Sequence, residues 1–68
     1  MTRTQMNKMA KSIVAFELVI QDPNVPEEKK DEARSQVSQI AAMLASLPGG
    51  LETMMQVDMM VENKLASM

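Results

Sequence analysis

The sequence contains no cysteine and no histidine. Without cysteine there is no disulfide, thiolate zinc site, iron–sulfur cluster or cysteine nucleophile. Without histidine, the commonest general base and the commonest nitrogen ligand for metals are missing. No histidine or carboxylate that could act as a general base lies beside Ser12, Ser35, Ser38 or Ser46 in the sequence. We therefore expect a protein that is not an enzyme and that carries no cofactor and no metal.

Aromatic residues are almost absent, since there is no Trp or Tyr and Phe16 is the only Phe. The chain has 68 residues and a mass of 7.5 kDa, which leaves room for one domain, residues 1–68. A chain this short buries only about 60% of its unfolded surface. Small domains compensate with disulfides, a metal, oligomerisation or very regular helix packing. Helix packing and self-association are the devices that remain for this chain.

Long hydrophobic runs are also missing. The longest run, residues 13–20, has eight residues and contains Glu17. A membrane-spanning helix needs about 20 apolar residues, and an export signal needs an apolar core followed by a small-residue cleavage site. We therefore expect no membrane partner and no secretion. The lack of cysteine fits a reducing compartment, so the expected location is cytoplasmic.

Glycine and proline occur in only two places, residues 22–26 and residues 47–50, apart from which the chain is free of helix breakers. The segments between these breaks are rich in Ala, Met, Leu, Glu, Lys and Gln, which favour helices. The pattern predicts an all-α fold with helices at about 3–22, 25–47 and 51–67. We expect a small three-helix bundle, or a helical hairpin plus a third helix, completed by homo-oligomerisation.

The first predicted helix carries an apolar seam at spacings of 3, 4, 3 and 4, namely Met6, Met9, Ile13, Phe16 and Ile20. This is the spacing of helices that pack on one another. A β-strand over residues 13–20 is the alternative, because four of these residues are β-branched. Beyond residue 13 the other sides are apolar too, which is typical of a buried helix. We therefore expect Phe16 and Val19 to lie in a partner or oligomer interface.

The second predicted helix has a narrower apolar stripe, formed by Ala33, Val37, Ile40, Leu44 and Leu47. The residues before it, Asn24 to Glu27, fit a capping box in which the Asn24 side chain accepts a backbone hydrogen bond and Glu27 reaches back. The sequence therefore predicts that this helix is capped by Asn24.

The third predicted helix is rich in methionine, which has a flexible side chain suited to irregular or variable contacts. At about 100° per residue its apolar arc spans about 200°, wider than a helix on a protein surface needs. Met54, like Met9, is predicted to fill the core. Met55 and Met59 fall on the outer flank and Met60 on the polar side, so a three-helix monomer would leave them exposed.

Three carboxylates fall on apolar faces: Glu17 on the first helix, and Asp58 and Glu62 on the third. Such acids could bind Mg²⁺ or Ca²⁺ or act as an acid–base pair, but no metal-binding loop or substrate site accompanies them. We expect instead ion pairs with Lys8, Lys11, Arg34 or Lys64, or exposure between protomers, because charges on apolar faces are usually paired. Met55, Asp58, Met59 and Glu62 together form the candidate docking surface.

Basic charge is not in excess, because seven basic and nine acidic residues give a net charge of −2. The charges are segregated: residues 1–16 hold three basic residues and no acid, and residues 52–62 hold three acids and no base. We expect these segments to pair within one chain or between two. Nucleic-acid binding through the basic segment is disfavoured, because no aromatic residue lies among Arg3, Lys8 and Lys11 to stack on bases.

These observations favour a non-enzymatic protein–protein interaction module: a regulator, inhibitor, adaptor or assembly factor that docks an apolar, methionine-rich helical face onto a partner. The expected partners are the chain itself, as a homodimer or higher oligomer, and an unidentified protein. The alternative is a ligand-sequestering oligomer that binds a small molecule or nucleotide between protomers.

Overall fold

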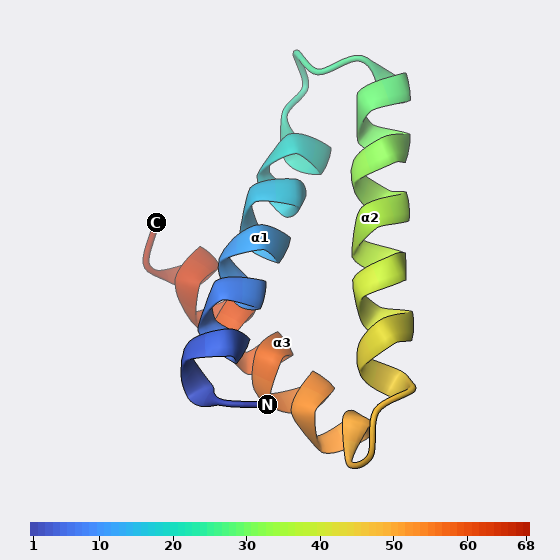
Figure 1. The fold of residues 1–68 in the computed structure, drawn as a ribbon. Helices are drawn as coiled ribbons and strands as arrows, with labels where there is room; N and C mark the ends of the chain where they lie inside the picture. Colours follow the sequence, from blue (N-terminus) through green and yellow to red (C-terminus); the bar gives the residue numbers. More distant parts are fainter.

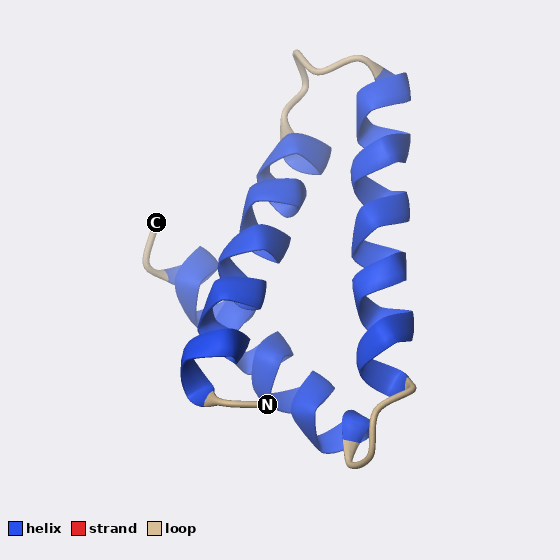
Figure 2. Cartoon of the chain, in the orientation of Figure 1, coloured by secondary structure: helices blue, strands red, loops and turns tan.

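The computed structural model describes residues 1–68 and contains three helices and no strand (Figure 2). They are α1 (Arg3–Gln21), α2 (Glu27–Ala45) and α3 (Gly50–Ala66). The predicted all-α class is confirmed, and residues 13–20 lie in a helix rather than a strand. Each helix begins and ends within two residues of the expected position.

The helices form a hairpin crossed by a third helix. In Figure 1, α1 and α2 run side by side in opposite directions, and α3 crosses behind the lower half of α1. α3 packs more extensively on α1 than on α2. The molecule measures 37 × 26 × 15 Å and its radius of gyration is 12.3 Å, against about 10.9 Å for a compact domain of this length. It is therefore flat and extended rather than spherical.

α1 begins with a capping box that the sequence analysis missed. The Thr2 hydroxyl accepts a hydrogen bond from the Gln5 backbone N–H at 3.1 Å, and the Thr2 N–H donates to Gln5 Oε1 at 2.8 Å. The pattern Thr-x-x-Gln is the sequence signature of this motif. The backbone N–H groups of Thr2 and Gln5, which have no helical carbonyl to donate to, both gain a hydrogen bond in this way.

α2 begins differently from the prediction. Its N-cap residue is Pro26, which provides no side-chain hydrogen bond, so the predicted capping box at Asn24 and Glu27 is wrong. Asn24 instead lies in a turn, where its backbone N–H donates to Asp22 Oδ1 at 2.9 Å. The fixed φ of proline suits the extended N-cap conformation, and the Pro26 carbonyl accepts the first helical hydrogen bonds, from Lys29 and Lys30.

The turn between α2 and α3 depends on both of its glycines. Gly49 caps α3 with φ = 69°, a left-handed conformation that only glycine adopts without strain. Gly50 is buried, and a Cβ atom there would collide with the backbone carbonyl oxygen of Leu44. The start of α3 can therefore lie directly against the end of α2.

The hydrophobic core is small and lies where α3 crosses the hairpin. Only eight of the 68 residues are buried, and Leu44 and Val57 are the most deeply buried large side chains. The core cluster consists of Ala10, Ile13, Val14, Leu44, Val57 and Val61. Met9 and Met54, predicted as core residues, are half-buried and pack against this cluster.

Met60 departs from the expectation that a three-helix chain leaves it exposed. It is half-buried and packs against the core. It shares a hollow with Arg3 and Met6, both from the start of α1. Because α3 crosses α1 obliquely, the first turns of α1 cover a side of α3 that parallel bundle packing would leave open.

The two glycines of this turn provide a test of the α2–α3 junction. Gly49→Ala should cost about 1 kcal/mol, because it strains one left-handed residue in open space. Gly50→Ala should cost at least about 3 kcal/mol, because a backbone carbonyl cannot move aside without displacing α3. That cost exceeds the roughly 1 kcal/mol that alanine gains in helix propensity. Urea unfolding followed by circular dichroism measures both; equal losses would contradict the close approach at Gly50.

Candidate interaction surfaces

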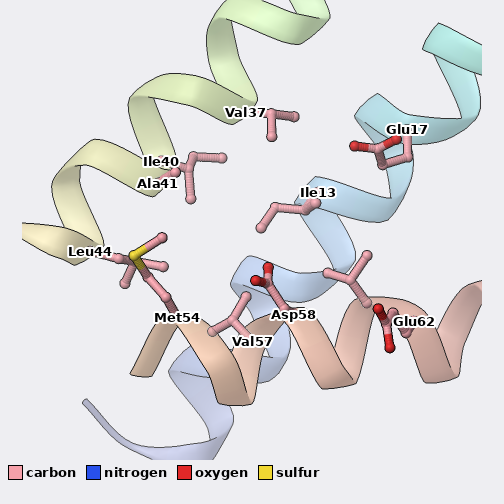
Figure 3. A pocket seen from close by; sticks show the side chains of 11 residues that line it. Ile13, Glu17, Val37, Ile40, Ala41, Leu44, Met54, Val57, Asp58 and Glu62 are labelled. Atoms are coloured by element: carbon pink, nitrogen blue, oxygen red, sulfur yellow. The ribbon is translucent and has the colours of Figure 1, made fainter. Parts of the chain in front are cut away.

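A groove of about 260 Å³ opens between the three helices (Figure 3). Its base is formed by core residues, among them Leu44 and Val57, and α2 contributes one wall through Val37, Ile40 and Ala41. Eight of its 11 lining residues are hydrophobic. We call it the acidic groove, because its other three lining residues are Glu17, Asp58 and Glu62.

The three carboxylates singled out in the sequence thus lie around one groove. Glu17 comes from α1, and Asp58 and Glu62 come from α3, one helical turn apart. Figure 3 shows Glu17 and Asp58 reaching towards the groove from two different helices. The fold therefore brings together acids that are more than 40 positions apart in the sequence.

No cation neutralises these acids within the chain. No Lys or Arg lines the groove, so the predicted ion pairs with Lys8, Lys11, Arg34 or Lys64 are not formed. Every ion pair of the chain lies on α2 instead: Lys29 with Glu32 at 3.8 Å, and Arg34 with Glu27 at 3.4 Å and with Asp31 at 2.7 Å. The three groove acids also do not form a group that could hold a metal ion.

The outer face of α3 carries a row of exposed apolar side chains. Leu51, Met55 and Met59 follow one another at intervals of four residues and are 75%, 67% and 62% exposed. We call these three residues the apolar strip. The exposure expected for Met55 and Met59 is confirmed. Leu51 was not among the predicted site residues, although its position one helical turn before Met55 predicts that the two side chains share one face of the helix.

A basic surface lies on another side of α1 and α3. It is a shallow hollow of about 460 Å³ lined by Lys11, Val14, Ala15, Leu18, Lys64, Ser67 and Met68. We call it the basic patch, because it has two lysines and no Asp or Glu. Neither lysine forms an ion pair with any carboxylate of the chain. Arg3 and Lys8 form none either, so the pairing expected between the basic segment 1–16 and the acidic segment 52–62 is absent within one chain.

The six predicted interface residues occupy three places, two of which adjoin on α3. Met55 and Met59 lie on the apolar strip, and Asp58 and Glu62 line the acidic groove. Phe16 and Val19 are half-buried and line a hollow against the first half of α2, beside Lys29, Glu32, Ala33 and Gln36. The fold does not unite all six on one surface.

Phe16 is therefore not part of the core, although it belongs to the predicted seam of the first helix. It is absent from the core cluster. The reason is geometric: α3 crosses the lower half of α1 (Figure 1), and Phe16 lies against the first half of α2 in a hollow that no residue of α3 lines. A residue between two helices without a third layer stays half-exposed.

Comparison with family models, with curated proteins and with solved structures finds no match to this chain. None of the three helices combines the length and the hydrophobicity that crossing a membrane requires.

The half-burial of Phe16 can be tested against a core residue. Phe16→Ala should cost about 2 kcal/mol, below the 3–5 kcal/mol of a fully buried Phe. Leu44→Ala should cost more, towards the upper part of the 2–5 kcal/mol range, because Leu44 is only 2% exposed. Chemical unfolding at one fixed protein concentration compares the two. A loss for Phe16→Ala equal to that for Leu44→Ala would place Phe16 in the core.

Proposed function

We propose that this chain is a non-enzymatic helical interaction module, acting as a regulator, inhibitor, adaptor or assembly factor, that docks the apolar strip of α3 onto a partner protein. The observation that carries the proposal is the strip itself. Single exposed apolar residues are ordinary on protein surfaces. Three large ones on successive turns of one helix, Leu51, Met55 and Met59, make a contiguous surface of the kind that marks interaction sites.

The chemistry of the strip indicates what it would bind. Methionine side chains adapt their shape to the partner. Asp58 and Glu62 border the strip on the side of the acidic groove, and both are exposed and unpaired. A partner helix with apolar anchors and a neighbouring Lys or Arg would therefore complement this face.

The total surface supports association. The chain exposes 4859 Å², whereas a folded monomer of this mass is expected to expose about 4,250 Å². The excess of about 600 Å² approaches the roughly 800 Å² that each partner contributes to a standard interface. The same excess supports the expectation that the chain associates with itself as a homodimer or higher oligomer.

The alternative function, a ligand-sequestering oligomer, has less support. The acidic groove holds about 260 Å³, below the roughly 300–1,000 Å³ of typical small-molecule sites. The basic patch, at about 460 Å³, falls within this range but is a shallow surface hollow. The acidic groove is also open to solvent at its acidic rim, so one chain alone does not enclose a ligand.

Met59→Asp tests the docking surface, with Met43→Asp as its control. Both methionines are exposed, at 62% and 51%, but Met43 lies on α2 away from the strip. The immobilised wild-type chain should retain a specific protein from a lysate of the source organism. Met59→Asp should lose at least nine-tenths of that binding, because a charge would be buried unpaired, whereas Met43→Asp should keep it.

Circular dichroism and light scattering accompany this binding experiment. Unchanged helicity and mass, together with lost binding, support docking of a partner protein through the strip. A fall in mass towards that of a single chain would instead assign the strip to self-association. Retention of every partner by Met59→Asp would refute the proposal.

A further inference from the structure

We propose that the acidic groove of one copy binds the basic patch of a second copy, so that the chain assembles head to tail. This goes beyond docking through the apolar strip, because it uses two other surfaces of the molecule. The ligand of the groove is then another copy of this chain, recognised by two lysines that flank exposed apolar side chains.

The groove has the chemistry of a receptor for such a surface. Its base and its wall on α2 are formed by apolar side chains. Its only charged side chains are the three carboxylates Glu17, Asp58 and Glu62. None of these carboxylates has a cation within the chain. An apolar surface bordered by uncompensated negative charge favours an apolar partner that carries positive charge.

The basic patch has the opposite charge and the same apolar character. Lys11 on α1 and Lys64 on α3 flank Leu18, which is 43% exposed, and Met68, which is 73% exposed. These exposed apolar side chains can enter a groove while the lysines meet its acidic rim. Both halves of a complementary contact are thus present on one chain.

The two surfaces cannot meet within one molecule. At about 100° per residue, Lys11 points about 120° away from Glu17 around the axis of α1. By the same geometry Lys64 points about 120° to 160° away from Asp58 and Glu62 on α3. The helices therefore present the acids and the lysines in different directions, and only a second copy can bring them together.

This geometry also determines the kind of assembly. A two-fold dimer would need the groove and the patch side by side on one self-complementary face, whereas two patches that point in different directions form a heterologous contact. Heterologous contacts repeat until they close into a ring, or else continue as an open filament. The assembly should therefore exceed two copies. It should weaken as salt is added, because exposed charges are screened over about 10 Å at 0.1 M salt.

Charge reversal on each surface separately tests the contact. Glu17→Lys/Glu62→Lys makes the groove basic, and Lys11→Glu/Lys64→Glu makes the patch acidic. Analytical ultracentrifugation at micromolar concentration should give more than twice 7.5 kDa for the wild-type chain. Each double variant alone should remain at 7.5 kDa, because like charges then face each other. An equimolar mixture of the two should assemble again, with the two variants alternating, to more than twice 7.5 kDa.

Two controls separate this contact from general charge effects and from the proposed docking. Lys8→Glu/Lys29→Glu changes the net charge as much as the patch variant, but neither residue lines the patch, so its mass should equal that of the wild type. Met59→Asp, on the apolar strip, should also keep the wild-type mass. Failure of the docking proposal and failure of head-to-tail assembly therefore give different results.

Folding of each variant is checked by circular dichroism, and Glu62→Lys alone replaces the groove variant if the half-buried Glu17 does not tolerate lysine. A wild-type chain that stays at 7.5 kDa or stops at twice that mass would overturn the proposal. So would a mixture of the two charge-reversed variants that fails to assemble.

Discussion

The direction in which α3 leaves the α2–α3 turn depends on the contact between Gly50 and the carbonyl of Leu44. Because Gly50 has no side chain, the first residue of α3 can lie against the last turns of α2. α3 is thereby directed across the hairpin and onto α1. The core forms at this crossing, where Leu44 and Val57 are the most deeply buried large residues, and all three interaction surfaces include residues of α3 or lie beside it.

The small core has a consequence for the outer surface. Since α3 crosses only the lower half of the hairpin, no residue of α3 lines the hollow in which Phe16 and Val19 lie against the first half of α2. Phe16 stays half-buried for this reason, and the flat molecule exposes more surface than a compact one of equal mass. A domain of this size has little stability to spare. Association would therefore add burial that the isolated chain lacks.

Local features of the sequence predicted most of the secondary structure, because helix propensity and the two clusters of breakers act over a few residues. The predicted cap at Asn24 was wrong because the backbone N–H of Asn24 donates to the Asp22 side chain in a turn, and Pro26 is the N-cap residue of the helix. The burial of Met60 and the grouping of Glu17 with Asp58 and Glu62 were not predictable. Both depend on the crossing direction of α3, which no local pattern encodes.

The unpaired charges act on orientation more than on affinity. An exposed ion pair contributes only about 0–1 kcal/mol, so three acids and two lysines do not by themselves hold two copies together. The apolar base of the groove and the exposed Leu18 would supply most of the affinity through burial. The charges exclude the wrong pairing, because groove against groove and patch against patch both juxtapose like charges. A chain without cysteine would in this way select one mode of assembly by the placement of five charged side chains.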